Sequence, residues 1–125
     1  EARRARKVLG GGMRQAGILA AAGLISLHDM SKRLQEDHDN AAYLAEAVSD
    51  IDSIRVVSQN TNFVMLWIEE DAKIAPEDFT AKLREHNILA NPYPGFKRKF
   101  RFVMHYWITR ERVEQIVEAV KTVLR

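Results

Sequence analysis

The sequence has 125 residues, of which 46% are hydrophobic and 29% are charged, and this is enough for one domain with an ordinary core. The formal net charge of +2 does not by itself indicate a polyanionic partner. Cysteine is absent, which excludes disulfides, thiolate metal sites and a cysteine nucleophile. No apolar run approaches the length of a membrane span and no signal-type region opens the chain, so no membrane partner is expected and an intracellular, cytoplasmic location is favoured.

The N-terminal region joins a basic segment to a run of glycines. Residues 1–9 carry four basic side chains, Lys7 among them, and predict a solvated helix end or a linker. Residues 10–12 are all glycine, so the backbone there can take positive φ or approach a neighbour closely. Two interpretations stay open for this run: a hinge before a buried helix, or an anion site at a helix N-terminus. The spacing of a nucleotide-binding loop is not present.

Two helices are expected next. Residues 13–27 are rich in alanine and glycine, which predicts a small-residue helix that needs a packing partner. Apolar residues at spacings of three, four and seven in residues 29–49 predict a long amphipathic helix, with Asp29 or Ser31 as its N-cap. Asp37 and His38 within it are metal-ligand types, but neighbouring helical residues point about 100° apart. A structural role is therefore favoured for this pair.

The second half of the chain alternates strands and helices. Strands are expected over residues 54–57, 62–68, 88–90 and 100–107, and the continuous apolar run in residues 62–68 predicts a central strand covered on both faces. Pro76 predicts a helix start, and Thr109 is a good N-cap for the last helix. Residues 91–95 hold two prolines and a glycine and predict an irregular loop. The expected fold is α+β, with a small, mostly antiparallel sheet of three to four strands covered by helices.

Basic and aromatic residues interleave between Lys97 and Phe102. Such a pattern can bind RNA, because cations follow the phosphate backbone while rings stack on bases. A strand with alternating faces gives a second interpretation, in which Lys99 and Arg101 lie on one face and Phe100 and Phe102 point into a core. An RNA-binding or protein-interaction module therefore remains an alternative function.

Four segments, at residues 6–23, 33–41, 61–64 and 101–105, resemble the low-specificity L-threonine aldolases. These are pyridoxal-phosphate (PLP) enzymes of the aspartate-aminotransferase fold type. The resemblance covers only the C-terminal portion of such an enzyme and implies that the sheet belongs to the C-terminal small domain. Residues 1–28 would then be a basic linker, glycine-rich turn and small-residue helix joining a large domain to an α+β domain at residues 29–125.

The resemblance implies roles for several side chains. Arg101 matches the arginine that pairs with the substrate α-carboxylate, a task that suits a planar guanidinium and not an ammonium. Lys7 and Arg14 match basic residues expected near the cofactor phosphate, either of the same subunit or of a neighbouring one. His105 also matches a family position, although a packed strand histidine is the favoured interpretation.

The resemblance also implies what this chain does not supply. The lysine that holds PLP is expected before residue 1, so no catalytic residue is expected here and the isolated chain should be inactive. No metal site is expected either, since Asp37 and His38 point apart. The intact enzyme would be a lyase that cleaves L-threonine or L-allo-threonine to glycine and acetaldehyde. Its partners would be a small-molecule amino acid and further copies of itself, with no nucleic acid.

Overall fold

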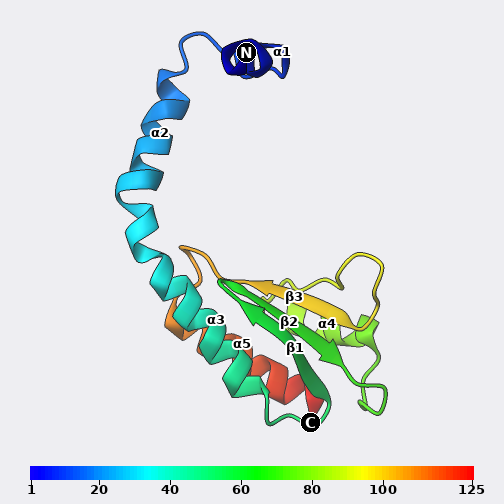
Figure 1. The fold of residues 1–125 in the computed structure, drawn as a ribbon. Helices are drawn as coiled ribbons and strands as arrows, with labels where there is room; N and C mark the ends of the chain where they lie inside the picture. Colours follow the sequence, from blue (N-terminus) through cyan, green and yellow to red (C-terminus); the bar gives the residue numbers. More distant parts are fainter. The chain divides into compact units, whose positions relative to one another are not determined.

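The computed structural model describes all 125 residues, which divide into two compact units, Glu1–Leu34 and Gln35–Arg125. Figure 1 shows the order of the elements along the chain. They are α1 (Ala2–Val8), α2 (Gly17–His28), the 3-10 helix η1 (Met30–Arg33), α3 (Leu34–Val48), β1 (Ile54–Asn60), β2 (Phe63–Ile68), α4 (Pro76–Glu85), β3 (Lys99–Val103) and α5 (Arg110–Leu124). None of these helices has both the length and the apolar character needed to cross a bilayer.

The glycine run of the first unit ends α1. Gly10 has a φ of 84°, and its N–H donates to the Lys7 carbonyl at 3.2 Å, while the Gly11 N–H donates to the Arg6 carbonyl at 2.8 Å. These two bonds form a Schellman motif, which satisfies carbonyls that a helix leaves free at its C-terminus. A Cβ on Gly11 would come within 2.8 Å of Arg6 Cγ. Residues 1–9 are thus an exposed helix with a glycine stop, which agrees with the predicted solvated helix end.

The small-residue helix is present as α2, but it begins at Gly17 and not at Met13. Gln15 has a φ of 53°, which no right-handed helix accepts, so the segment before Gly17 is irregular. No residue of α2 is buried, and Ile18 is 87% exposed. The predicted need for a packing partner is not met within the first unit.

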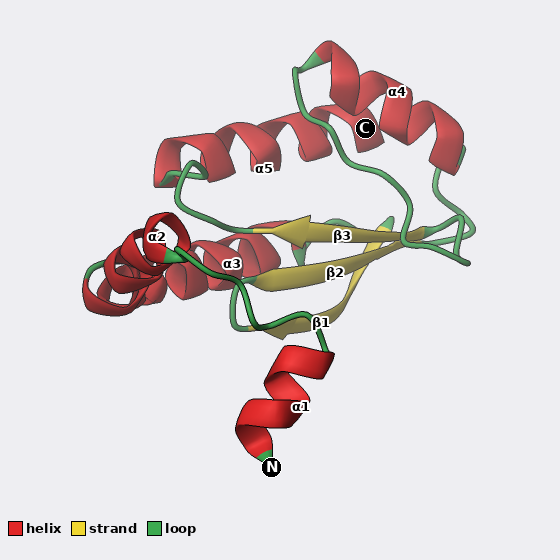
Figure 2. Ribbon diagram, turned by 90° about the horizontal axis from the view of Figure 1, so that it is seen from above, coloured by secondary structure: helices red, strands yellow, loops and turns green.

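The second unit is built on an antiparallel sheet with strand order β1-β2-β3. Val64, Leu66 and Ile68 of β2 are buried, whereas the alternate residues of the strand are half-buried or exposed. Figure 2 shows α4 and α5 on one side of this sheet, and the buried residues of α3, α4 and α5 form one core cluster with those of the strands. The predicted covering of both faces of β2 is therefore wrong for this chain. One face of the sheet is open, because strand side chains alternate and the helices pack on only one side.

Several boundaries also differ from the prediction. The segment 88–90 is not a strand: the Ile88 N–H donates back to the Leu83 carbonyl at 3.0 Å, and only Pro92 bridges β3, opposite Phe100. β3 ends at Val103, earlier than predicted. The long helix is preceded by η1, and Asp29 makes no side-chain capping bond. The α+β fold with a small antiparallel sheet is confirmed.

Candidate functional site

Arg101 lies in the middle of β3, directly opposite Met65 of β2. Its neighbours Phe100 and Phe102 are 0% and 7% exposed and belong to the core, so the strand has the alternating faces that the sequence predicts. Arg101 itself is exposed. The arginine therefore stands on the open face of the sheet, opposite to the helices.

The guanidinium of Arg101 has aromatic neighbours and no anionic one. Its Cζ lies 5.6 Å from the centre of the Phe63 ring and 5.7 Å from that of Tyr93. No carboxylate forms an ion pair with it and no carbonyl accepts a hydrogen bond from it. A guanidinium has five N–H donors in a fixed plane, and here all five stay available for a ligand.

The other basic residues of the segment 97–102, here called the basic cluster, have different partners. Lys97 Nζ lies 3.8 Å from a carboxylate oxygen of Glu77, and the Arg98 guanidinium donates to the Glu69 carbonyl at 2.9 Å. Lys99 Nζ lies 5.4 Å from the centre of the Tyr93 ring and 5.1 Å from that of Phe96. Arg101 and Lys99 are thus the two cations of this cluster without an acceptor.

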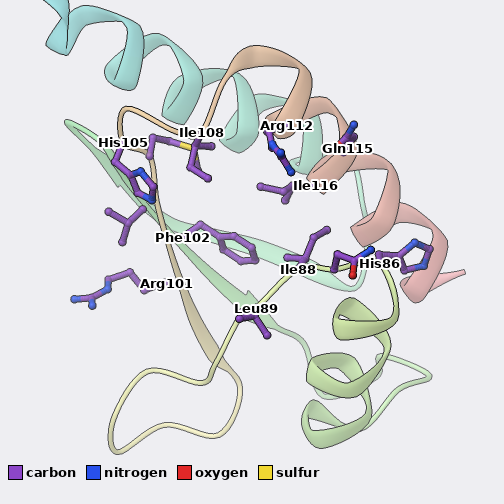
Figure 3. Close-up of a pocket in the computed structure, with 13 residues that line it drawn as sticks. His86, Ile88, Leu89, Arg101, Phe102, His105, Ile108, Arg112, Gln115 and Ile116 are labelled. Atoms are coloured by element: carbon purple, nitrogen blue, oxygen red, sulfur yellow. The ribbon is translucent and has the colours of Figure 1, made fainter.

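A cavity of about 520 Å³ lies between the end of β3, residues 86–89 and the first turns of α5. Arg101 lines this cavity together with Phe102 and Arg112, and Figure 3 shows its guanidinium pointing away from those two side chains. No carboxylate lines it, and its lining includes the basic side chains of Arg112, His86 and His105. The sequence gives no sign of this grouping, because residues far apart in the chain meet only in the folded unit.

The structure corrects the interpretation of His105 as a packed strand histidine. His105 is exposed and follows the end of β3. Its Nδ1 accepts a hydrogen bond from the Trp107 N–H at 3.4 Å, and the two rings are 6.1 Å apart, edge to face. The strand ends before this histidine, so its side chain is held within a turn.

Lys7 and Arg14 both belong to the first unit. Lys7 is exposed in the last turn of α1, and its side-chain stem approaches the glycine run so closely that a Cβ on Gly12 would lie 3.0 Å from Lys7 Cγ. Arg14 is exposed in the irregular segment before α2. Neither cation forms an ion pair with a carboxylate.

Asp37 and His38 are neighbours in α3. Asp37 is 4% exposed within α3, and no group of three or more histidine, aspartate, glutamate or cysteine side chains is arranged to hold a metal ion.

The sequence profile of the family described as beta-eliminating lyase matches residues 1–71. The chain therefore belongs to the beta-eliminating lyase family.

Within this class, the chain is similar to threonine aldolases. It is 36% identical over 125 residues to a probable low-specificity L-threonine aldolase 2 of Arabidopsis thaliana, covering 98% of this chain and 35% of that protein. It is 39% identical over 111 residues to the low specificity L-threonine aldolase of Escherichia coli K12, covering 89% of this chain and 31% of that protein. The resemblance seen in the sequence is thus confirmed. The chain spans about a third of the length of these relatives.

Solved structures confirm the fold. A decarboxylase from Sulfurospirillum multivorans superposes with a TM-score of 0.71 at 22% identity, over 100% of this chain and 37% of that one. An alanine–glyoxylate aminotransferase from Nostoc sp. gives a TM-score of 0.68 at 23% identity, over 85% of this chain and 29% of that one. The fold of this chain thus recurs within a decarboxylase and an aminotransferase that are each about three times its length.

Proposed function

We propose that this chain forms the C-terminal part of a PLP-dependent lyase that cleaves L-threonine or L-allo-threonine to glycine and acetaldehyde. The observation that carries the proposal is Arg101, an exposed arginine on the open face of the sheet whose N–H donors have no protein acceptor. It occupies the position at which the resemblance to the threonine aldolases places the arginine that binds the substrate carboxylate. Its planar fork would make two parallel hydrogen bonds to the α-carboxylate of the substrate and fix the orientation of the amino acid.

The first unit would serve the cofactor and the connection to a larger domain. Lys7 and Arg14 are exposed cations without an acidic partner, and they would contact the phosphate of PLP, in the same subunit or in a neighbouring one of a homo-oligomer. Residues 1–28 would connect the α+β domain at residues 29–125 to the domain that holds the PLP lysine. When bound, PLP supplies an electron sink for the pair released as the Cα–Cβ bond breaks. This chain's own contribution is binding and orientation.

The test is the substitution Arg101→Ala in the intact, PLP-loaded enzyme. Removing one partner of a charged, hydrogen-bonded pair in a shielded site costs about 2–5 kcal/mol. We therefore expect kcat/KM for threonine to fall by about 30-fold to several thousand-fold. Arg101→Lys should recover little, because an ammonium keeps the charge but loses the fork.

Arg55 provides a matched control. It is an exposed arginine with its Cζ 5.7 Å from the centre of the Trp67 ring, but its guanidinium is paired with Glu69 at 2.7 Å. Arg55→Ala should leave kcat/KM within about twofold, because an exposed pair contributes little. Near-normal kinetics in Arg101→Ala would refute the proposed binding of the substrate carboxylate by Arg101. Loss of PLP binding in that variant would make Arg101 a structural residue.

The alternative of RNA binding has one supporting observation, the rings and cations gathered on the open face of the sheet. Binding through phosphates weakens steeply with salt, in proportion to the number of contacts. If the aldolase assignment is right, the chain should bind single-stranded RNA only weakly and without sequence preference. Tight, sequence-dependent binding at physiological salt would favour the alternative.

A further inference from the structure

Arg101 is held from two sides by rings that come from different parts of the chain. Phe63 opens β2 and pairs with Val103, so it lies diagonally across the strands from Arg101. Tyr93 comes from the loop that precedes β3 and lies on the other edge of that strand. The guanidinium lies 5.6 Å from the first ring centre and 5.7 Å from the second. Arg101 therefore has a bracket of two rings and no other partner.

Such a bracket restrains a guanidinium without using its hydrogen-bond donors. A ring attracts the cation through the negative charge on its face, and arginine stacks on aromatic faces more readily than lysine does. A carboxylate in the same place would instead occupy the N–H groups that a ligand needs. The two rings thus limit the rotamers of Arg101 and leave its donors free.

Phe63 is fixed by the turn that precedes it. The Asn62 side chain donates to the Met104 carbonyl at 2.7 Å, and the Met104 N–H donates to the Asn62 carbonyl at 2.8 Å. These bonds join the β1–β2 turn to the chain just beyond β3. The first ring of the bracket is therefore tied to the strand that carries Arg101.

Tyr93 is fixed by a tight turn of its own. The Phe96 N–H donates to the Tyr93 carbonyl at 2.9 Å across Pro94 and Gly95, and Gly95 has a φ of 84°. Proline followed by a residue at positive φ is the pattern of a type II turn. The Tyr93 N–H donates in addition to the Lys99 carbonyl at 2.6 Å. Backbone bonds on both sides thus hold the second ring against β3.

We infer that Tyr93 is a positioning residue for substrate binding, which acts by ordering the Arg101 guanidinium as a receptor for the α-carboxylate. The inference rests on the proposed role of Arg101. Ordering a flexible side chain in advance reduces the entropy that ligand binding must otherwise offset. The carboxylate is bound both before and during bond cleavage, so loss of this order weakens both states alike. The expected kinetic effect is therefore on KM and not on kcat.

The experiment uses the intact, PLP-loaded enzyme with Tyr93→Leu, Tyr93→Phe and the control Trp67→Leu. The leucine variant should raise KM for threonine about 3- to 30-fold, the range of one cation–π contact, with kcat within about twofold. The phenylalanine variant keeps the ring and should remain near the wild type. Trp67→Leu removes a ring beside a different arginine, Arg55, and should leave KM unchanged. Equal rises in Tyr93→Leu and Trp67→Leu would overturn the inference.

A double substitution separates the inference from the proposed function. In an Arg101→Gln background, Tyr93→Leu should have no further effect on KM, because the group that it orders is gone. If Tyr93→Leu raises KM by the same factor in both backgrounds, Tyr93 acts independently of Arg101 and the inference is wrong. If Arg101→Gln itself leaves KM unchanged, the proposed function fails instead.

A measurement without catalysis tests the geometry directly. Nuclei beside ring faces have shifted NMR signals, so the side-chain signals of Arg101 should move in Tyr93→Leu and not in Trp67→Leu. Unchanged Arg101 signals in Tyr93→Leu would show that the ring does not contact the guanidinium, and this would overturn the inference whatever the kinetics.

Discussion

The two units use the same kind of element but stabilise it differently. The helices of Gln35–Arg125 bury one face each, as α5 does with Val113, Val117 and Val120. The helices of Glu1–Leu34 bury no residue at all, although α2 carries apolar side chains around its whole circumference. Short helices gain most of their stability from packing an apolar face and little from propensity. The second unit therefore contains its own core, whereas the first lacks packing of its own.

This difference agrees with the proposed roles of the two units, substrate binding for the second and connection to a larger domain for the first. A site that must orient a substrate needs side chains on rigid elements, and Arg101 stands on a strand whose neighbours are core residues. A connecting segment that packs against another domain must expose apolar surface when it is seen by itself, as α2 does.

The largest expected effect on the free energy of unfolding comes from a substitution in the core of the second unit. Phe100 is fully buried and its ring meets that of Phe79 edge to face, with centres 5.1 Å apart. Phe100→Ala should lower the free energy of unfolding by about 3–5 kcal/mol, through lost transfer energy and the cavity left behind. The change in the free energy of unfolding can be measured by urea denaturation monitored by circular dichroism.

Leu24→Ala in α2 is the matched control for that core substitution. Leu24 is 55% exposed, so its truncation should change the free energy of unfolding by no more than about 0.5 kcal/mol. Comparable losses in the two variants would mean that α2 shares the core of the second unit, and the comparison between the units would fail.

An intermediate effect comes from two glycines with the same backbone angle. Gly10 and Gly95 both have a φ of 84°, and a Cβ on either would meet nothing within 4 Å. Alanine is strained at such an angle by about 1–2 kcal/mol. Gly95→Ala should therefore lower the unfolding free energy of the second unit by about that amount.

Gly10→Ala should leave the stability of the second unit unchanged and reduce only the helical signal of α1, whose Schellman motif it disturbs. The free energy of unfolding is obtained from the cooperative transition in urea. The helical content is obtained from the amplitude of the circular dichroism spectrum before that transition. A fall in the transition midpoint for Gly10→Ala would show that the two units unfold together.

The sequence predicts best where local signals and packing agree. Pro76 with acidic residues after it marks the start of α4, and apolar spacing in residues 113–123 marks the buried face of α5. The sequence predicts the structure less well where contacts between residues far apart in the chain determine it. The run in residues 63–68 cannot reveal that helices cover one face only, and Gln15 gives no sign of the positive φ that delays α2.

The residues of the candidate site also differ in how well the sequence predicts them. Its arginine could be found from a strand pattern and a family resemblance, because both depend on neighbours in sequence. The ring of Tyr93 could not, since its place beside Arg101 depends on the pairing of Pro92 with Phe100 and on the turn at Gly95. The prolines and glycine of residues 91–95 predict a loop, but not which side chain it presents to the sheet.

The smallest expected effect concerns the start of α5, where the second unit uses a local interaction in place of burial. A hydrogen bond from the Thr109 side chain, and then one from the Glu111 backbone, hold the pKa of the Glu111 carboxyl below its usual range. A carboxyl whose pKa is lower in the folded state stabilises the fold above its unfolded pKa, and this contribution is lost as the pH falls through the folded value. Glu111→Gln should therefore lower the melting temperature slightly at pH 7 and by nothing measurable near pH 2. Thr109→Ser, which keeps the hydroxyl, is the control and should retain the pH dependence of the wild type. A difference between Glu111→Gln and wild type that persists unchanged at pH 2 would mean that the carboxylate charge at the helix N-terminus is not its source.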